Sequence, residues 1–295
     1  MNRRRFLTVC AALAMPSAVS ARTAEQQWTG RALGAQARIT LRGPEAAVAQ
    51  TLADCVALIR GIEQEMSLFD PASALVRLNR EGVLRDPPDR LVRLLGTVGR
   101  IHRLTGGRFD PTVQPLWRAL ALGGDIDAAR RAIGWDHVRV NAGHITLAQG
   151  QALTLNGIAQ GFATDLVADL LKARGFETAL VAVGEMRALG GPWRVGVSDP
   201  AQGVIGTVAL TGGAVATSSP SALMLGDGGH ILNPLASGRP LWTTVSVQAD
   251  TATLADGLST ALVFGQTDEI RRIRAAMPGV RGVTLVDAEG NLRSV

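Results

Sequence analysis

Apolar residues recur every three or four positions in two long stretches of the chain, the spacing that places them on one face of a helix. The first stretch runs from residue 44 to 66, and its apolar face carries Val48, Leu52, Cys55, Ile59 and Ile62. The second runs from 89 to 104 and stops at Thr105-Gly106-Gly107, a sequence typical of a helix end. The pattern therefore predicts two long amphipathic helices.

Short runs in which apolar and polar residues alternate predict strands along the rest of the chain. We expect these strands at 35–41, 137–140, 144–148, 152–155, 178–183, 193–197, 207–210, 214–217 and 243–248, the second to fourth as a meander. Further helices are expected at 156–174, 251–264 and 268–276, and a hairpin around Gly290. Strands in runs, without strict alternation with helices, predict an α+β fold with mixed, largely antiparallel sheets flanked by helices.

The first residues have the pattern of an export signal. Arg3, Arg4 and Arg5 stand in the segment 2–8, an apolar run follows to about Met15, and small residues at 17–21 offer a cleavage site. Paired arginines before Phe6 and Leu7 indicate the twin-arginine route, with an ordinary secretory signal as the alternative. We therefore expect residues 1–21 to be cleaved, residues 22–27 to form a linker, and residues 22–295 to be a single periplasmic domain.

Composition narrows the range of partners. The chain has 30 basic and 25 acidic residues, but three of the arginines lie in the predicted signal, so the mature chain is nearly balanced in charge. This balance gives no reason to expect a nucleic-acid partner. No apolar stretch after the signal is long enough to cross a bilayer, so the mature chain is not expected to span a membrane. Cys55 is the single remaining cysteine, which excludes a disulfide within one chain.

Asp256 and Thr260 stand out within the otherwise apolar stretch 251–264. Because they are four residues apart, a helix places both side-chain oxygens on one face. A carboxylate taken out of water needs a partner or a metal ion. Two interpretations remain open: Asp256 caps the first turn while Thr260 bonds to a carbonyl of the preceding turn, or the two residues hold a hard cation.

Common catalytic motifs are absent from the sequence: it contains no Walker phosphate loop, no G-x-G-x-x-G after a strand, no H-E-x-x-H, no G-x-S-x-G and no C-x-x-C. Ordinary hydrolase and dehydrogenase functions are therefore not favoured. Short polar segments remain as candidates at 65–70 and 77–79, 106–112, 156–161 and 229–234.

In their order and spacing these segments resemble the ApbE family of FAD:protein FMN transferases. The family patterns are M-G-T, E-x-x-x-S-x-F/Y with S-E-L-x-x-x-N, G-x-F-D-P-T-V, D-L-G-G-I-A-K-G-Y-A-V-D, H-I-I-D-P-x-T-G and A-D-A-L-S-T. Their counterparts here are 33–35, 66–69 with 73–79, 107–113, 154–165, 230–238 and 255–260. The resemblance covers essentially the whole mature chain, and it implies a ligand cleft between two lobes.

The resemblance implies a Mg²⁺-dependent transfer of the FMN half of FAD to a threonine hydroxyl of an acceptor protein, with release of AMP; Mn²⁺ is an alternative cation. The expected acceptor is a periplasm-facing flavoprotein subunit of a redox complex. A chain of this family with a twin-arginine signal resembles NosX, an accessory factor of nitrous-oxide respiration. Two other functions stay open: a protein that holds FAD without transferring it, and an FAD pyrophosphatase that releases FMN and AMP.

The resemblance also implies the site residues. Asp256, Thr260 and the backbone carbonyl of Ala159 would hold the metal ion, and His230 and Asp256 would be catalytic. The residues implied in flavin-nucleotide binding are Leu33, Met66, Ser67, Phe69, Phe109, Asp110, Asn156, Gly157, Phe162, His230 and Ile231. For Asp110 a helix cap ahead of Pro111 is the alternative, and for His230 a purely structural role.

Several positions depart from the family pattern. The frequent lysine is Gln160, the usual aspartate before Leu155 is Thr154, Gly184-Glu185-Met186 replaces G-G-D, and Ser219 replaces the glycine of A-T-S-G. The remaining departures are Asn156, Phe162 and Asn233. Because lysine and glutamine differ by a full charge beside a polyanion, Gln160 predicts slower transfer with binding retained.

Overall fold

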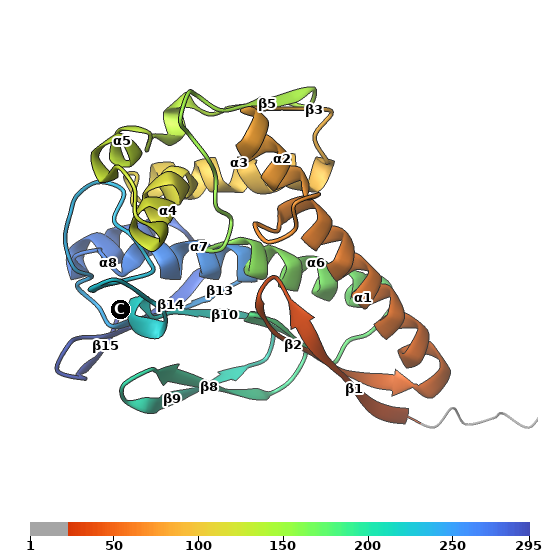
Figure 1. Cartoon of the computed structure of the whole chain (residues 1–295). Helices are drawn as coiled ribbons and strands as arrows, with labels where there is room; N and C mark the ends of the chain where they lie inside the picture. The colour runs from red at the N-terminus through yellow and green to blue at the C-terminus, as the bar shows by residue number, and fades with distance from the viewer. Residues whose placement is uncertain (1–22) are drawn as a thin grey trace, which may run out of the picture.

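The computed structural model describes residues 23–295, so the predicted signal lies outside the described residues. Its base is an eight-stranded sheet in the order β1-β2-β6-β7-β10-β13-β14-β15, with every neighbouring pair antiparallel (Figure 1). The strands are β1 (Thr23–Ala32), β2 (Ala35–Pro44), β6 (Ala179–Val183), β7 (Glu185–Leu189), β10 (Gly213–Ser218), β13 (Thr244–Ala249), β14 (Val280–Val286) and β15 (Leu292–Ser294).

Four helices lie along one face of this sheet (Figure 1): α1 (Glu45–Met66), α6 (Ala159–Ala173), α7 (Ala252–Leu262) and α8 (Thr267–Ala276). Helix α7 contacts β10 and β13, and α6 contacts β6 and β7. The predicted apolar face of α1 is buried, with Val48, Cys55 and Ile62 fully enclosed in the core. This confirms the amphipathic pattern that predicted the helix.

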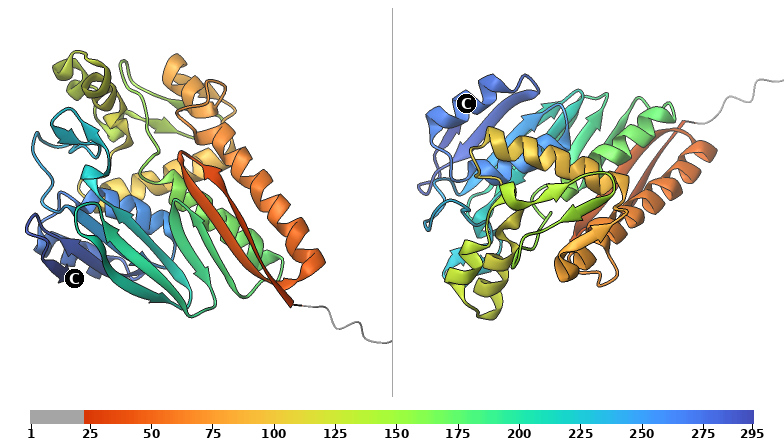
Figure 2. Two further views of the ribbon diagram at one scale, coloured as in Figure 1. Left: turned by 60° about the horizontal axis from the view of Figure 1, so that its bottom comes forward. Right: turned by 90° about the horizontal axis from the view of Figure 1, so that it is seen from above.

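A second lobe lies beyond these helices, away from the large sheet (Figures 1 and 2). It contains α2 (Ala74–Glu81), α3 (Asp89–Leu104), α4 (Gln114–Leu122), α5 (Ile126–Arg131) and a small sheet of β3 (Val83–Arg85), β5 (His144–Thr146) and β4 (Arg139–Val140). Helix α3 has the predicted bounds and packs against α7, so one hydrophobic core joins the two lobes.

Short elements complete the chain. A hairpin of β8 (Trp193–Asp199) and β9 (Gly203–Leu210) packs against β7 and β10 of the large sheet through a small second core cluster. Strand β11 (Met224–Leu225) pairs with β12 (Gly228–Gly229). Three single turns of 3-10 helix are η1 (Pro111–Val113), η2 (Trp135–His137) and η3 (Pro220–Ala222). The mixed helices and antiparallel sheets confirm the predicted α+β class.

Two sequence-based expectations are wrong. Residues 23–27 of the expected linker 22–27 are not a linker, because β1 begins at Thr23 and all of its residues pair with β2. Residues 152–155 are not a strand of a meander, because their backbone bonds elsewhere: the Asn79 side chain bonds both polar groups of Leu153, and the Thr154 amide donates to the carbonyl of Pro111. Helices α2, α4 and α5 and strands β1, β3, β7, β11 and β12 were not predicted.

Within residues 23–295, no helix combines the length and the apolar character that crossing a bilayer requires.

Candidate active site

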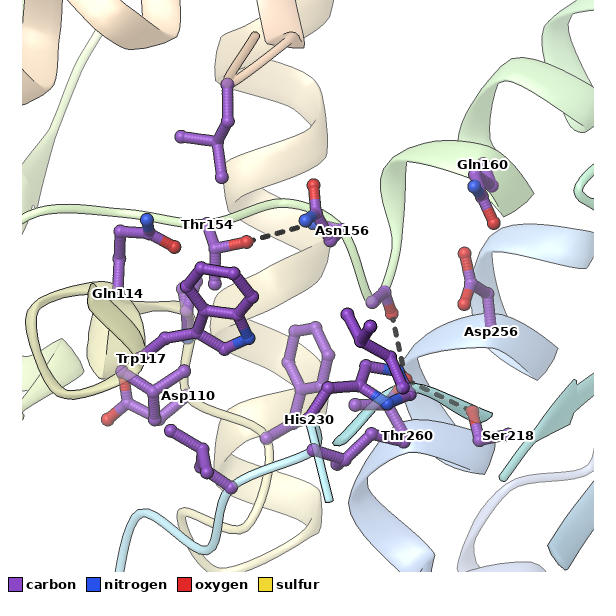
Figure 3. A pocket seen from close by; sticks show the side chains of 18 of the residues that line it. Asp110, Gln114, Trp117, Thr154, Asn156, Gln160, Ser218, His230, Asp256 and Thr260 are labelled. Atoms are coloured by element: carbon purple, nitrogen blue, oxygen red, sulfur yellow. Dashed lines mark hydrogen bonds between the residues drawn. The ribbon is translucent and has the colours of Figure 1, made fainter. Parts of the chain in front are cut away.

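A cavity of about 810 Å³ lies between the two lobes and is lined from both of them. Asn79 on α2 and Trp117 on α4 come from the second lobe, whereas Gln160 on α6, Ser218 on β10 and Asp256 on α7 come from the sheet and its helices (Figure 3). The cleft between lobes that the sequence predicted is therefore present.

Asp256 lies in the middle of α7 and does not cap it. The cap of this helix is Thr251, whose Oγ1 accepts from the Leu254 amide, while Asp165 of α6 accepts from the amides of Ala252 and Thr253. The capping interpretation of Asp256 is thus wrong. The Asp256 carboxylate is 3% exposed, and its Oδ2 accepts from the Gly161 amide at 2.9 Å.

Two carboxylates without a basic partner share this part of the cavity. Burial raises the pKa of Asp256 to about 7, against the opposing hydrogen bond from Gly161. Burial, and then the charge of Asp256, also raise the pKa of Glu185 well above its ordinary value. Neither carboxylate forms an ion pair with any residue between 23 and 295. A cation bound here would favour the ionised form of both groups.

Thr260 lies one turn after Asp256, against the loop that precedes α6. Its Oγ1 is 3.4 Å from the carbonyl oxygen of Gly157 and 3.4 Å from Ser218 Oγ (Figure 3). A Cβ at Gly157 would come within 2.9 Å of the Thr260 side chain, so glycine permits this approach. The carboxylate and hydroxyl of α7 and the Gly157 carbonyl therefore face one region, a set of oxygens suited to a hard cation.

Gln160 occupies the cavity near Asp256 (Figure 3). Its Nε2 donates to the carbonyl of Leu33 at 3.1 Å, which ties the turn between β1 and β2 to the start of α6. A neutral amide therefore stands where the family pattern has an ammonium group, and the side chain is already engaged in a structural bond. Glu185 and Asp256 receive no compensating positive charge from it.

His230 faces the same end of the cavity as Thr260 and Ser218 (Figure 3). Its Nδ1 lies 3.0 Å from the carbonyl oxygen of Pro220, which also accepts from the His230 amide. A carbonyl oxygen can only accept, so the neutral ring carries its proton on Nδ1. Nε2 is then the unprotonated nitrogen and is able to take a proton from a ligand.

Asp110 lines the cavity, but its carboxylate is occupied by local hydrogen bonds. Oδ1 accepts from the amide and the hydroxyl of Thr112, at 2.8 and 2.5 Å, and Oδ2 accepts from the Trp135 amide at 3.0 Å. The residue therefore caps η1, as the alternative interpretation expected. These bonds fix the position of the neighbouring wall of the cavity.

The other implied binding residues divide into two groups. Phe69, Phe109, Asn156, Gly157 and Ile231 line the cavity, and the exposed ring of Phe69 lies at its edge. Leu33, Met66, Ser67, Ala159 and Phe162 are not among the lining residues. Met66, Ala159 and Phe162 are buried in the core, and Ser67 Oγ accepts from the Phe69 amide. The functional roles of both groups stay predictions.

Sequence reasoning missed part of the lining. Trp117, Gln114 and Arg118 come from α4, a short helix that was not predicted although Pro115 near its start is a typical signal. Arg80 and Arg108 also line the cavity. Ser218 lies at the end of β10, in the segment that matches the family pattern A-T-S-G, but it was not among the residues implied in binding.

Comparison with known proteins agrees with this geometry. The model of the ApbE family matches residues 33–283. The chain belongs to the ApbE family. An FAD:protein FMN transferase of Salmonella typhimurium is 28% identical, over 88% of this chain and 83% of its own length. One of Treponema pallidum is 29% identical, over 82% of this chain and 79% of its own length.

Solved ApbE structures have the same fold. The flavin transferase ApbE from Vibrio cholerae superposes with a TM-score of 0.80 at 21% identity, covering 93% of this chain and 97% of that one. The ApbE protein of Thermotoga maritima superposes with a TM-score of 0.81 at 25% identity, covering 92% and 96%. Flavin transfer is therefore the enzymatic activity for which the cavity has to account.

Proposed function

We propose that this ApbE-family chain is an exported enzyme that transfers the FMN half of FAD to a threonine hydroxyl of an acceptor protein. The threonine oxygen bonds to the phosphorus of the FMN half, the bond from that phosphorus to the AMP oxygen breaks, and AMP leaves. The proton of the threonine passes to a base. FAD is the substrate named for the curated relatives, and the cavity between the lobes has room for it.

The observation that carries the proposal is the buried Asp256 carboxylate, which has no basic partner among residues 23–295. An ionised buried carboxylate is stable when it holds a cation. Asp256 and Thr260 would hold Mg²⁺, or Mn²⁺ in its place, and the Gly157 carbonyl beside Thr260 is the backbone oxygen that faces them. Ala159, whose carbonyl the resemblance implied as the further ligand, does not line the cavity. When bound, the cation would neutralise the charge of the pyrophosphate.

His230 is the proposed base. Its Nδ1–H donates to Pro220, which orients the ring and leaves Nε2 to accept the threonine proton. Gln160 supplies no charge to the pyrophosphate, which supports a slower rate than a lysine at this position would give.

Export to the periplasm is proposed from the sequence of residues 1–21, and it sets the kind of acceptor. A periplasm-facing flavoprotein subunit of a redox complex would meet the enzyme there. The twin-arginine route carries folded proteins, so the chain could acquire FAD before it is exported.

The test is to incubate the purified protein with FAD, Mg²⁺ and a candidate acceptor, and to measure the masses of all products. A gain of one FMN on the acceptor, with AMP released, supports the proposal. Unchanged FAD indicates a binding protein, and free FMN plus AMP with unmodified acceptor indicates a pyrophosphatase. Either result would contradict the transfer.

Variants of the same assay separate the roles of the residues. Asp256→Asn is expected to lower transfer at least a hundredfold, because the cation loses its carboxylate. Gln160→Lys is expected to raise the rate with little change in KM. Asp268→Asn, an exposed carboxylate on α8 that pairs with Arg271, is the matched control and should keep full activity. Full activity of Asp256→Asn would refute the metal assignment.

A further inference from the structure

Helix α4 carries two side chains into the cavity that the implied site residues do not include, Gln114 and Trp117 (Figure 3). They are three residues apart, so the helix places them on one face. Leu116, on another face, is fully buried and holds the helix in the second lobe. The pair therefore forms part of the wall that the second lobe contributes to the cavity.

The local hydrogen bonds of Asp110 fix the place where α4 begins. The carboxylate accepts from the amide and hydroxyl of Thr112 and from the amide of Trp135. The turn η1 that it caps runs directly into α4, which begins at Gln114. The pair is thus held by a firmly bonded segment before any ligand binds.

The side-chain amide of Gln114 is enclosed but makes no hydrogen bond within residues 23–295. The residue is 8% exposed. No side-chain polar atom in that part of the chain is both fully covered and unpaired, so the Gln114 amide reaches the open space of the cavity. A primary amide offers an acceptor and a donor side by side. An enclosed amide without a protein partner points to a ligand that supplies the complement of both.

Trp117 presents an indole ring to the same space. The residue is partly exposed, and its Nε1 makes no hydrogen bond to the part of the chain that the structure describes. None of the other tryptophans, all of which lie within residues 23–295, lines this cavity. An indole face that lies open in a cavity suits a flat aromatic ligand.

Together the two side chains match a planar ring that has a donor and an acceptor next to each other on its edge. FAD contains two such rings: the isoalloxazine, whose N3–H lies between two carbonyl groups, and adenine, whose amino group lies beside ring nitrogens. Phosphate oxygens only accept, so they would satisfy only the nitrogen of the Gln114 amide. A pyrophosphate held at Asp256 on α7 leaves a ring of the same molecule to extend towards α4 in the other lobe.

We propose that Gln114 and Trp117 form a ring-binding subsite of this cavity: the indole stacks on the isoalloxazine or the adenine of FAD, and the Gln114 amide forms hydrogen bonds to the edge of that ring. The inference rests on the proposed function for FAD as the ligand. Neither side chain is needed to move a proton or to hold the cation. The pair therefore sets affinity and ring specificity, and the transfer step is left to the α7 side of the cavity.

The first test measures the Kd of FAD with Mg²⁺ by isothermal titration calorimetry, without an acceptor protein. Trp117→Ala should weaken binding about five- to a hundredfold, the range for loss of one stacking contact. Trp117→Phe keeps an aromatic face and should weaken it less. Gln114→Leu should weaken binding about five- to tenfold, because the ring edge loses its partner.

Matched controls lie outside the cavity. Trp193→Phe changes a partly exposed tryptophan of β8 whose Nε1 donates to the Leu189 carbonyl. Gln50→Leu changes an exposed glutamine of α1. Both variants should keep the wild-type Kd for FAD.

A second test identifies the ring, with FMN and ADP as probes that carry one ring each. A loss of affinity in Trp117→Ala and Gln114→Leu for FMN but not for ADP assigns the isoalloxazine, and the reverse assigns adenine. Indole in contact with isoalloxazine quenches the flavin emission by electron transfer, whereas a phenyl ring does not, and the chain has no tyrosine.

The emission of the bound probes gives a readout that a structural role would not move. If the isoalloxazine is the ring, the wild-type protein quenches bound FMN and Trp117→Phe restores its emission. If adenine is the ring, ADP shifts the tryptophan emission of the wild-type protein and not that of Trp117→Phe. This comparison needs only the conservative variant, so it holds even where truncation to alanine disturbs α4.

Wild-type Kd values for FAD in both Trp117→Ala and Gln114→Leu would overturn the inference, and so would weaker FAD binding with the affinities for FMN and ADP both unchanged. Failure of the wild-type protein to bind FAD would overturn both proposals. Bound FAD without transfer would overturn the proposed function alone.

Discussion

At the scale of single residues, the two carboxylates of the cavity that lack a basic partner, Asp256 and Glu185, make the stability of the protein depend on pH. The pKa of Asp256 is raised to about 7, and that of Glu185 is also raised, so the folded protein holds protons that the unfolded chain releases above pH 4 to 5. The contribution of these two groups to stability is therefore greatest at acidic pH and falls as pH rises towards 7. The slope is at most about 1.4 kcal/mol per pH unit for each group.

The measurement is urea unfolding between pH 5 and pH 8 in the presence of EDTA. Asp256→Asn should flatten the fall, because it removes one titrating group, and added Mg²⁺ should flatten it in the wild-type protein by holding the carboxylate ionised. Asp268→Asn is again the matched control. Equal stability of the EDTA-treated wild-type protein at pH 5 and pH 8 would contradict the buried state of Asp256 without a basic partner.

Residue spacing alone predicted that Asp256 and Thr260 share a face, because the period of a helix is a local property. It did not decide between a cap and a metal site. The groups that bond to the first amides of α7 belong to Asp165, which lies on another helix and far away in the sequence.

At the scale of elements, the segment 152–157 forms one wall of the cavity and depends on α2 for its position. The Asn79 side chain donates to the Leu153 carbonyl at 2.8 Å and accepts from its amide at 2.7 Å, and Leu153 is fully buried. Asn79→Ala leaves both groups unsatisfied, so we expect a loss of about 2 to 4 kcal/mol in the free energy of unfolding and weaker FAD binding.

Urea unfolding and FAD titration of the same variant check this prediction. Asn141→Ala is the matched control, since Asn141 also bonds backbone amides, but in an exposed turn away from the cavity. It should leave the Kd of FAD unchanged. An Asn79→Ala protein with unaltered stability and Kd would show that the wall is held by other contacts.

The sequence predicted the elements that have a long, regular pattern and missed or misjudged the short ones. Long helices with a clear apolar face, such as α1 and α3, were predicted because periodicity over many residues is unambiguous. Residues 152–155 have the apolar character of a strand, but a side chain and a loop satisfy their backbone. Strand β1 was missed because it is a polar strand at the edge of the sheet, and α5 because it is too short for periodicity to register.

At the scale of the whole molecule, the two lobes share one hydrophobic core and also enclose one cavity. Helix α3 of the second lobe packs against α7, and Ile101 of α3 and Leu258 of α7 both belong to the same buried cluster. We therefore expect a single cooperative thermal transition. FAD bound in the cavity between the lobes would contact both of them, and it should raise that single transition because it binds only the folded form.

At a free FAD concentration of about one hundred times the Kd, the stabilisation is about 2.7 kcal/mol, which corresponds to a rise in Tm of roughly 5 to 10 °C for a chain of this size. The measurement is differential scanning calorimetry with Mg²⁺ and FAD. Riboflavin, which lacks the pyrophosphate, is the control ligand and should give a much smaller rise. Two separate transitions, with only one shifted by FAD, would contradict a shared core and a ligand held between the lobes. A single shifted transition in Asp256→Asn as large as in the wild-type protein would instead leave the lobes coupled but place the pyrophosphate away from α7.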